Sequence, residues 1–76
     1  MEAKFKITIA AARTNAGLTQ KEFADELNVD RTTVVNWEKG KYIPNLPHLR
    51  RISEITKIPM DYIFVPTTLP KVDNLQ

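Results

Sequence analysis

The stretch that decides the fold covers residues 19–40 and reads TQKEFADELNVDRTTVVNWEKG. It opens with the pattern Thr-x-x-Glu, in which the side chains of Thr19 and Glu22 can cap each other's backbone amides at the start of a helix. Three apolar residues follow at helical spacing. Asn28 then tolerates the left-handed backbone that commonly ends a helix. The pattern predicts a helix over 20–27.

A second helical segment follows after a gap of only about three residues. Asp30 is a strong N-cap residue, and Gly40 is the residue type found most often just past a helix end. Between them, Val34 and Trp37 lie three residues apart, which is the spacing of a buried helix face. We therefore expect a helix over 31–39. Two helices joined by so short a connection are typical of a helix-turn-helix.

Three more helices are predicted outside this pair. An apolar, alanine-rich segment over 7–16 is the first. Asn45 caps another, whose apolar residues recur every three positions and predict one buried stripe: Leu46, Leu49, Ile52 and Ile55. A short helix over 60–64 is the last. With no strand alternation of useful length, the sequence predicts an all-α domain of five helices.

The length of 76 residues corresponds to one small domain, and the chain contains no cysteine. Disulfides and Cys-based zinc or iron–sulfur sites are therefore excluded. The one histidine, His48, cannot form a metal site alone, and we expect no metal, cofactor or small-molecule ligand. We expect an N-terminal arm over 1–6, one domain over 7–65 and a Pro-containing tail over 66–76.

The net charge of +2 is small, but it is unevenly distributed along the chain. Residues 31–51 hold five basic side chains and one acidic side chain, which gives +4, whereas residues 20–30 hold one basic and four acidic side chains, which gives −3. The positive stretch contains the second helix of the pair and the loop after it. No uncharged stretch approaches the roughly 20 residues of a membrane span, and the N-terminus lacks a signal-peptide pattern, so we expect a cytoplasmic protein.

Twelve residues form a pattern that goes beyond helical periodicity. They are Leu18-Thr19-Gln20, Phe23-Ala24, Val29, Val34, Trp37-Glu38-x-Gly40, Pro44 and Leu49. In order and spacing they resemble the lambda-repressor-like, Cro-type (XRE) helix-turn-helix proteins, over about residues 7–64. Asn28 stands where that family usually has Gly in the turn, and Lys57 where Gly or Asn often ends the fourth helix. The resemblance implies that the segment 31–39 lies in the major groove of double-stranded DNA.

The resemblance places four side chains of this reading helix at base edges: Arg31, Thr32, Val35 and Asn36. Arg suits the O6/N7 edge of guanine, Asn suits adenine, and Thr or an apolar side chain can meet the methyl group of thymine. Thr32 and Asn36 are four residues apart and therefore share one helix face. From composition alone a solvated surface would be the preferred interpretation of this face, and Arg31 could bind a phosphate instead of a base.

The resemblance also implies contacts with the sugar–phosphate backbone of DNA. The residues concerned are Gln20, Lys21, Thr33, Lys39, Lys41, Tyr42 and Asn45. Lysines supply charge without sequence information, whereas the uncharged polar side chains supply directional hydrogen bonds. The alternative for the segment after the reading helix is a flexible basic loop. Gln20 could instead be a solvated residue, or it could brace the start of the reading helix.

An ion pair between Arg13 and Glu38 is a further implication of the resemblance, because relatives tie the first helix to the end of the third in this way. We expect this pair to be structural, and we expect Trp37 in the core beneath the reading helix rather than on DNA bases. No Cys/His dyad can exist, and two glycines are too few for a Gly-rich phosphate loop. We therefore expect no enzyme activity.

Together these features predict a Cro-like transcriptional repressor, of phage or prophage type, that occludes its operator as a homodimer. Two reading helices about 34 Å apart would match one turn of DNA. One such module buries only about 600–1,000 Å² on DNA, which is usually too little for tight specific binding. Dimer contacts are expected at four apolar side chains, which could instead complete the monomer core: Tyr62, Ile63, Phe64 and Val65.

Two alternatives remain open from the sequence. One is an antitoxin-like regulator that binds a protein partner as well as DNA. The other is an adaptor that has the helix-turn-helix shape but binds only protein. The dependence of DNA affinity on salt separates them, since phosphate contacts release counterions and weaken as the salt concentration rises. We expect no ligand-binding or cleavage domain after the fifth helix, and this expectation favours the Cro-like role.

Overall fold

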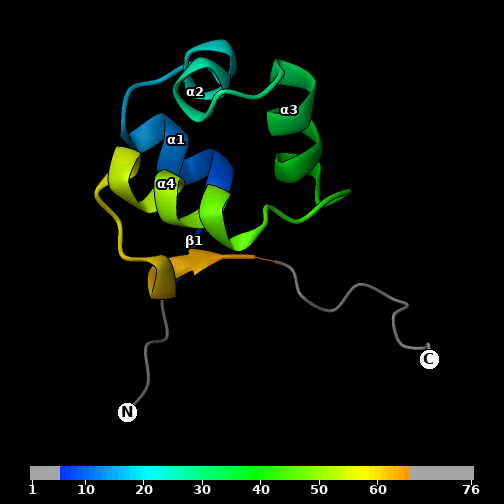
Figure 1. The fold of residues 1–76 in the computed structure, drawn as a ribbon. Coiled ribbons are helices and arrows are strands. Elements are labelled where there is room, and N and C mark those ends of the chain that lie inside the picture. Colours follow the sequence, from blue (N-terminus) through cyan, green and yellow to red (C-terminus); the bar gives the residue numbers. More distant parts are fainter. Residues whose placement is uncertain (1–5, 66–76) are drawn as a thin grey trace, which may run out of the picture.

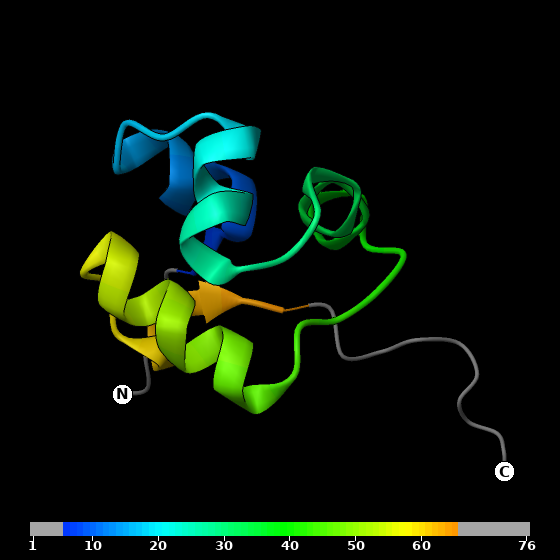
Figure 2. The same ribbon diagram turned by 45° about the horizontal axis from the view of Figure 1, so that its top comes forward.

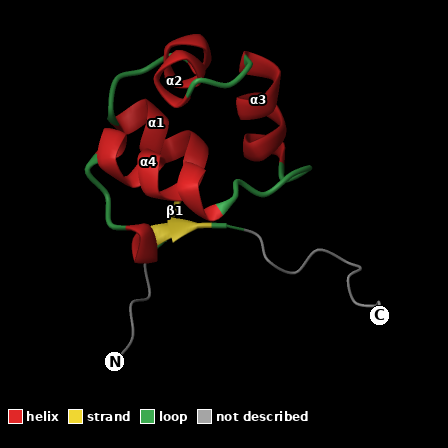
Figure 3. Cartoon of the chain, in the orientation of Figure 1, coloured by secondary structure: helices red, strands yellow, loops and turns green. Residues whose placement is uncertain are grey.

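The computed structural model describes residues 6–65, in which four α-helices form the domain (Figures 1 and 3). The helices are α1 (Ile9–Asn15), α2 (Gln20–Leu27), α3 (Arg31–Lys39) and α4 (Leu46–Thr56). A 3-10 turn, η1, covers Met60–Tyr62, and the strands β1 (Ile7–Thr8) and β2 (Ile63–Phe64) pair in parallel. Most of the predicted arm and all of the predicted tail lie outside the described residues.

The predicted fifth helix over 60–64 is wrong. Only one 3-10 turn forms there, and the chain becomes extended at Ile63, with φ −92° and ψ 122°. Ile63 pairs with Ile7, and Phe64 pairs with Thr8. These are β-branched or aromatic residues, which favour extended backbone. The described residues therefore contain four α-helices and one two-stranded ribbon, and strands of two residues are too short to show alternation in a sequence.

The first helix begins two residues later than the predicted range 7–16. Its N-cap is Thr8, whose hydroxyl oxygen accepts a hydrogen bond from the backbone N–H of Ala11 at 3.0 Å. The helix therefore starts at Ile9, and the preceding residues are left extended to pair with β2. Its end was predicted more closely, because Gly17 adopts the left-handed backbone with φ 78° just beyond it.

Local capping signals place α2 and α3 at the predicted positions. The Thr19 hydroxyl accepts from the Glu22 backbone N–H at 3.0 Å, and the Glu22 carboxylate accepts from the Thr19 backbone N–H at 2.8 Å. Asn28 ends α2 with φ 60°, and Gly40 ends α3 with φ 80°. Asp30 occupies the N-cap position of α3, but its side chain makes no capping hydrogen bond.

The fourth helix also has the predicted caps, but its buried stripe is narrower than predicted. Asn45 accepts the backbone N–H of His48 at 3.0 Å, and Lys57 ends the helix in the left-handed conformation with φ 64°. Leu46 is 56% exposed, whereas Ile52 is fully buried. An α-helix has 3.6 residues per turn, so a period of three drifts around the helix and cannot keep four residues on one face.

The core lies where the four helices meet, and Phe23, Val34 and Ile52 are its largest fully buried side chains. α1 and α4 cross the middle of the domain, between α2 and the strand pair (Figure 1). The strand pair adds Ile63 to the core and joins the two ends of the described chain. Among residues 6–65, no helix is long and apolar enough to span a membrane.

Candidate nucleic-acid interface

α3 stands at the edge of the bundle, and Figure 2 shows it (green) nearly end-on with one side turned away from the other helices. Its inward side buries Val34 and Trp37. Arg31 and Thr32 at its start are exposed, and Asn36 is half-buried one turn later. The helix is therefore anchored through one side and leaves the other side available to a partner.

The two remaining outer positions of α3 are less exposed than Arg31 and Thr32. Thr33 and Val35 are half-buried, so each offers only part of its side chain to the surface. Val35 is the apolar member of this face, and its contact with a thymine methyl group stays a prediction. All predicted base-contacting residues thus reach the surface of one helix, although their DNA contacts remain predictions.

A cluster of polar side chains surrounds the end of α3 and the loop after it. Lys39, Lys41 and Tyr42 are exposed, and Tyr42 is one of the most exposed large side chains, at 63%. Asn45 is also exposed, but its carbonyl oxygen already caps α4. The capping bond uses only the side-chain oxygen of Asn45, so its amide N–H groups can still donate to a phosphate oxygen.

Ion pairs reduce the basic region that the sequence indicated. Arg51 on α4 pairs with Glu26 on α2 at 3.6 Å and with Glu54 at 3.2 Å, so its charge is balanced locally. Lys21 pairs with Asp25 at 3.3 Å, but both side chains are at least two-thirds exposed and such a pair contributes little. Lys21 can therefore turn to a phosphate at small cost.

Three basic residues beside α3 have no salt-bridge partner within residues 6–65: Arg31, Lys39 and Lys41. One lies at the start of the helix and two lie at its end. An elongated positive border of this kind suits a polyanion that runs along the helix, since phosphate contacts fix register and orientation. These three residues, which we call the basic border, carry positive charge that no ion pair within residues 6–65 balances.

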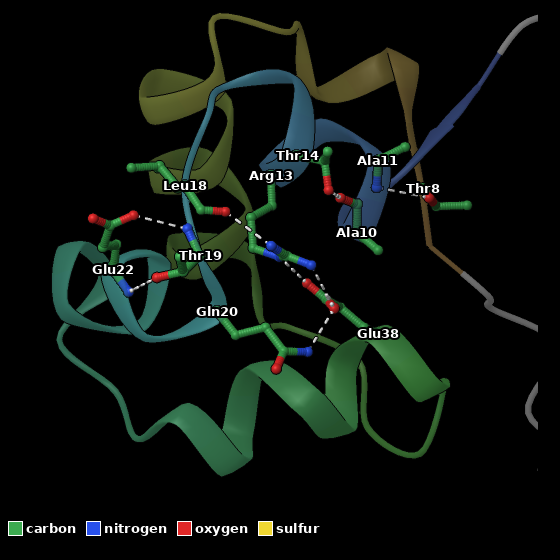
Figure 4. A network of polar contacts seen from close by, with 10 residues as sticks. All are labelled: Thr8, Ala10, Ala11, Arg13, Thr14, Leu18, Thr19, Gln20, Glu22 and Glu38. Carbon is green, nitrogen blue, oxygen red and sulfur yellow. Dashed lines mark hydrogen bonds and ion pairs between the residues drawn. The ribbon is translucent and has the colours of Figure 1, made fainter.

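A polar network holds α3 from the inside (Figure 4). Arg13 Nε donates to Glu38 Oε2 at 2.7 Å, which is the ion pair that the resemblance implied. Arg13 Nη1 also donates to the carbonyl oxygen of Leu18 at 2.8 Å. The two charged side chains are only 16% and 9% exposed, so the pair ties α1 to the end of α3 in a largely buried position.

Gln20 belongs to the same network. The sequence allowed a contact of Gln20 with the reading helix but gave no indication of its bond to Glu38. Its Nε2 donates to Glu38 Oε1 at 3.0 Å, so the side chain braces the end of α3 rather than its start. Gln20 and Glu38 are eighteen residues apart, and no periodicity or capping pattern links them. The bond from Arg13 to the Leu18 carbonyl oxygen could not be predicted either, because every residue has a backbone carbonyl and its residue type does not show which one accepts.

Trp37 lies in the core, as predicted, and is 5% exposed. Its ring packs against the His48 ring of α4, with centroids 5.2 Å apart and planes tilted by 54°. The indole therefore supports α3 from beneath and cannot stack on DNA bases without leaving the core. The lone histidine is a packing partner in the described chain.

Three of the four predicted dimer residues have side chains that are at least partly exposed. Tyr62 is 45% exposed and Phe64 is 46% exposed, while Val65 is half-buried against the core. Ile63 instead belongs to the monomer core, which the sequence left open as the alternative, because alternation along β2 turns it inward, where it is 3% exposed; a dimer contact at Ile63 is therefore wrong. The dimer role of the other three stays a prediction.

Comparison with known proteins adds independent information to this geometry. A family model described as helix-turn-helix matches residues 9–63, which is most of the chain. The chain is 36% identical over 58 residues to the HTH-type transcriptional activator BcrR of Enterococcus faecalis. It is 35% identical over 52 residues to the HTH-type transcriptional regulator ImmR of Bacillus subtilis. No solved structure gives a significant match.

The shared region covers different fractions of these relatives. It spans 76% of this chain but 28% of BcrR, and 68% of this chain but 41% of ImmR. An uncharacterized HTH-type transcriptional regulator of Archaeoglobus fulgidus is 36% identical over 53 residues, which span 70% of this chain and 76% of that protein. The helix-turn-helix family model, over residues 9–63, contains all four α-helices of residues 6–65. The chain therefore belongs to the XRE-type helix-turn-helix family.

Proposed function

We propose that this chain binds double-stranded DNA in a sequence-specific manner and regulates transcription, with α3 as the reading helix in the major groove. The observation that carries the proposal is the division of α3 into an anchored side and a free side. Val34 and Trp37 hold the helix in the core, while Arg31, Thr32 and Asn36 face outward. Family membership supports the same reading, since the relatives are named as transcriptional regulators.

The proposed division of labour on DNA follows from side-chain chemistry. Arg31 and Asn36 have the donor and acceptor geometry to read guanine and adenine, and Thr32 can bond either a base or a phosphate. The lysines of the basic border, together with Tyr42 and the half-buried Thr33, contact the sugar–phosphate backbone. Gln20, Lys21 and Asn45 approach the backbone from the starts of α2 and α4.

We also propose that the chain acts as a Cro-like repressor that occludes an operator as a homodimer. A single module of this size buries about 600–1,000 Å² on DNA, so pairing two modules on a two-fold site raises affinity and specificity. A protein bound over a promoter blocks transcription by occupying the DNA, without any further contact. Tyr62 and Phe64 supply exposed aromatic surface for the contact between copies.

The test is binding to duplex DNA at several salt concentrations. Each phosphate-bound basic residue contributes about −0.9 to the slope of log affinity against log salt. The three lysines proposed to contact phosphates, Lys21, Lys39 and Lys41, therefore predict a slope of about −3 for each bound copy, and about twice that for a dimer. Affinity that stays flat between about 50 and 200 mM salt would favour the protein-only adaptor instead.

A further inference from the structure

The hydrogen bond between Gln20 and Glu38 has a consequence for DNA contact. A carboxylate can only accept hydrogen bonds, whereas a carboxamide has an accepting oxygen and two donating N–H groups. Glu38 therefore selects one orientation of the Gln20 amide, with its nitrogen toward α3, at the observed 3.0 Å. Figure 4 shows the amide nitrogen turned to Glu38 and the amide oxygen turned away from it.

The carboxylate itself is held from two sides. Arg13 Nε binds Oε2 at 2.7 Å, and Arg13 Nη2 lies 3.4 Å from Oε1, the oxygen that also accepts from Gln20. The Glu38 side chain is only 9% exposed, so it cannot turn away into solvent without breaking these bonds. Arg13 thus holds the Glu38 carboxylate in place, and the carboxylate fixes the orientation of the Gln20 amide.

Gln20 is the first residue of α2 and is half-buried, so the residue is partly accessible from the surface. One of its two N–H groups is used by Glu38, and no hydrogen bond within residues 6–65 uses the other, which can donate to a second acceptor. A phosphate oxygen is such an acceptor, but the amide oxygen would repel it. An unrestrained amide samples both orientations, and only one of them suits a phosphate.

We propose that Glu38 is a positioning residue for DNA binding, which holds the Gln20 amide so that its second N–H donates to a DNA phosphate. Glu38 itself does not touch DNA. Its carboxylate connects the reading helix α3 with the start of α2, which is proposed to face the DNA backbone. The position of the reading helix on the bases and the phosphate contact of Gln20 are therefore coupled through Glu38. This inference rests on the proposed function, because it requires that the chain binds DNA.

A double-mutant cycle on DNA affinity tests the proposal. The four proteins are the wild-type chain, Gln20→Ala, Glu38→Gln and the double variant, measured on a duplex that the wild-type chain selects from random sequence. Gln20→Ala is expected to weaken binding about tenfold, since a hydrogen bond to a charged group is lost. Glu38→Gln is expected to weaken binding about fivefold when Gln20 is present and less than about twofold when position 20 is Ala.

Controls separate positioning from loss of stability. Glu38→Gln keeps the side-chain shape but removes the charge opposite Arg13, so all measurements are made at a temperature where circular dichroism shows every variant folded. Ile52→Val serves as the matched control, because it destabilises the core without touching the network. Its DNA affinity is expected to stay within about twofold of that of the wild-type chain.

A second readout needs no DNA. The side-chain amide signals of Gln20, followed by nuclear magnetic resonance, are expected to shift in Glu38→Gln and to remain in place in Ile52→Val. Unchanged signals in Glu38→Gln would overturn the inference. Equal losses of affinity from Glu38→Gln in both backgrounds would also overturn it, while leaving the proposed function intact. If the wild-type chain selects no duplex at all, the proposed function and the inference both fall.

Discussion

The two sides of the nine-residue helix α3 serve different purposes. The inward side places Val34 and Trp37 in the core and Glu38 in a largely buried network. The outward side carries Arg31 and Asn36, which contribute nothing to the core. Residues that hold the helix are therefore separate from residues proposed to read DNA. Substitutions on the inward side should change the free energy of unfolding, and those on the outward side should change DNA affinity alone.

The largest effect is expected from Trp37→Ala. The indole is 5% exposed and packs between the helix and His48, so its removal leaves a cavity in a small core. The expected loss is about 3–5 kcal/mol in the free energy of unfolding. Thermal or urea unfolding followed by circular dichroism measures it. A loss below about 1 kcal/mol would show that the inward side does not anchor α3.

Arg13→Met is expected to have the next largest effect. Methionine keeps much of the apolar stem but leaves Glu38 without its charged partner in a site that is 9% exposed. The free energy of unfolding should fall by about 2–3 kcal/mol, somewhat less than for a fully buried pair. Urea unfolding again provides the value. Matched unfolding curves for variant and wild type would mean that the pair has no net effect on stability.

On the outward side, Asn36→Ala should leave the free energy of unfolding within about 0.5 kcal/mol of the wild-type value. It should reduce discrimination between the preferred base pair and others at one position by about 1–3 kcal/mol. Competition binding with single-base variants of the selected duplex measures this. An equal loss on every duplex would contradict a base-reading role for Asn36.

The smallest effect is expected from Lys41→Ala, which removes one charge from the basic border. Affinity should fall by a similar factor on preferred and random duplexes, because a phosphate contact carries no sequence information. The slope of log affinity against log salt should become shallower by about 0.9. Tyr42→Phe is a useful companion, since it removes a hydroxyl group without changing charge and should leave the slope unaltered.

The same comparison explains how much could be predicted from the sequence. The bounds of α2 and α3 were predictable because their caps are local, as in the reciprocal bonds of Thr19 with Glu22 and the left-handed Asn28 and Gly40. Burial of Val34 and Trp37 followed from helical spacing. These signals need only neighbours within a few residues of one another.

Features that depend on distant partners could not be predicted in this way. The pairing of Ile7 with Ile63 joins residues at opposite ends of the described chain, and neither strand is long enough to show a pattern. The bond from Gln20 to Glu38 links residues in different helices. Leu46 was misplaced because a repeat of three only approximates the helical period.

The central claim is that the outward side of α3 reads DNA while its inward side holds the fold. Selection of bound duplexes from random sequence, run in parallel for the wild-type chain and Asn36→Ala, tests it most directly. The wild-type chain should enrich a defined motif, and the variant should lose preference at one position while retaining the remainder. An identical motif from both proteins, or no motif from the wild-type chain, would contradict the account.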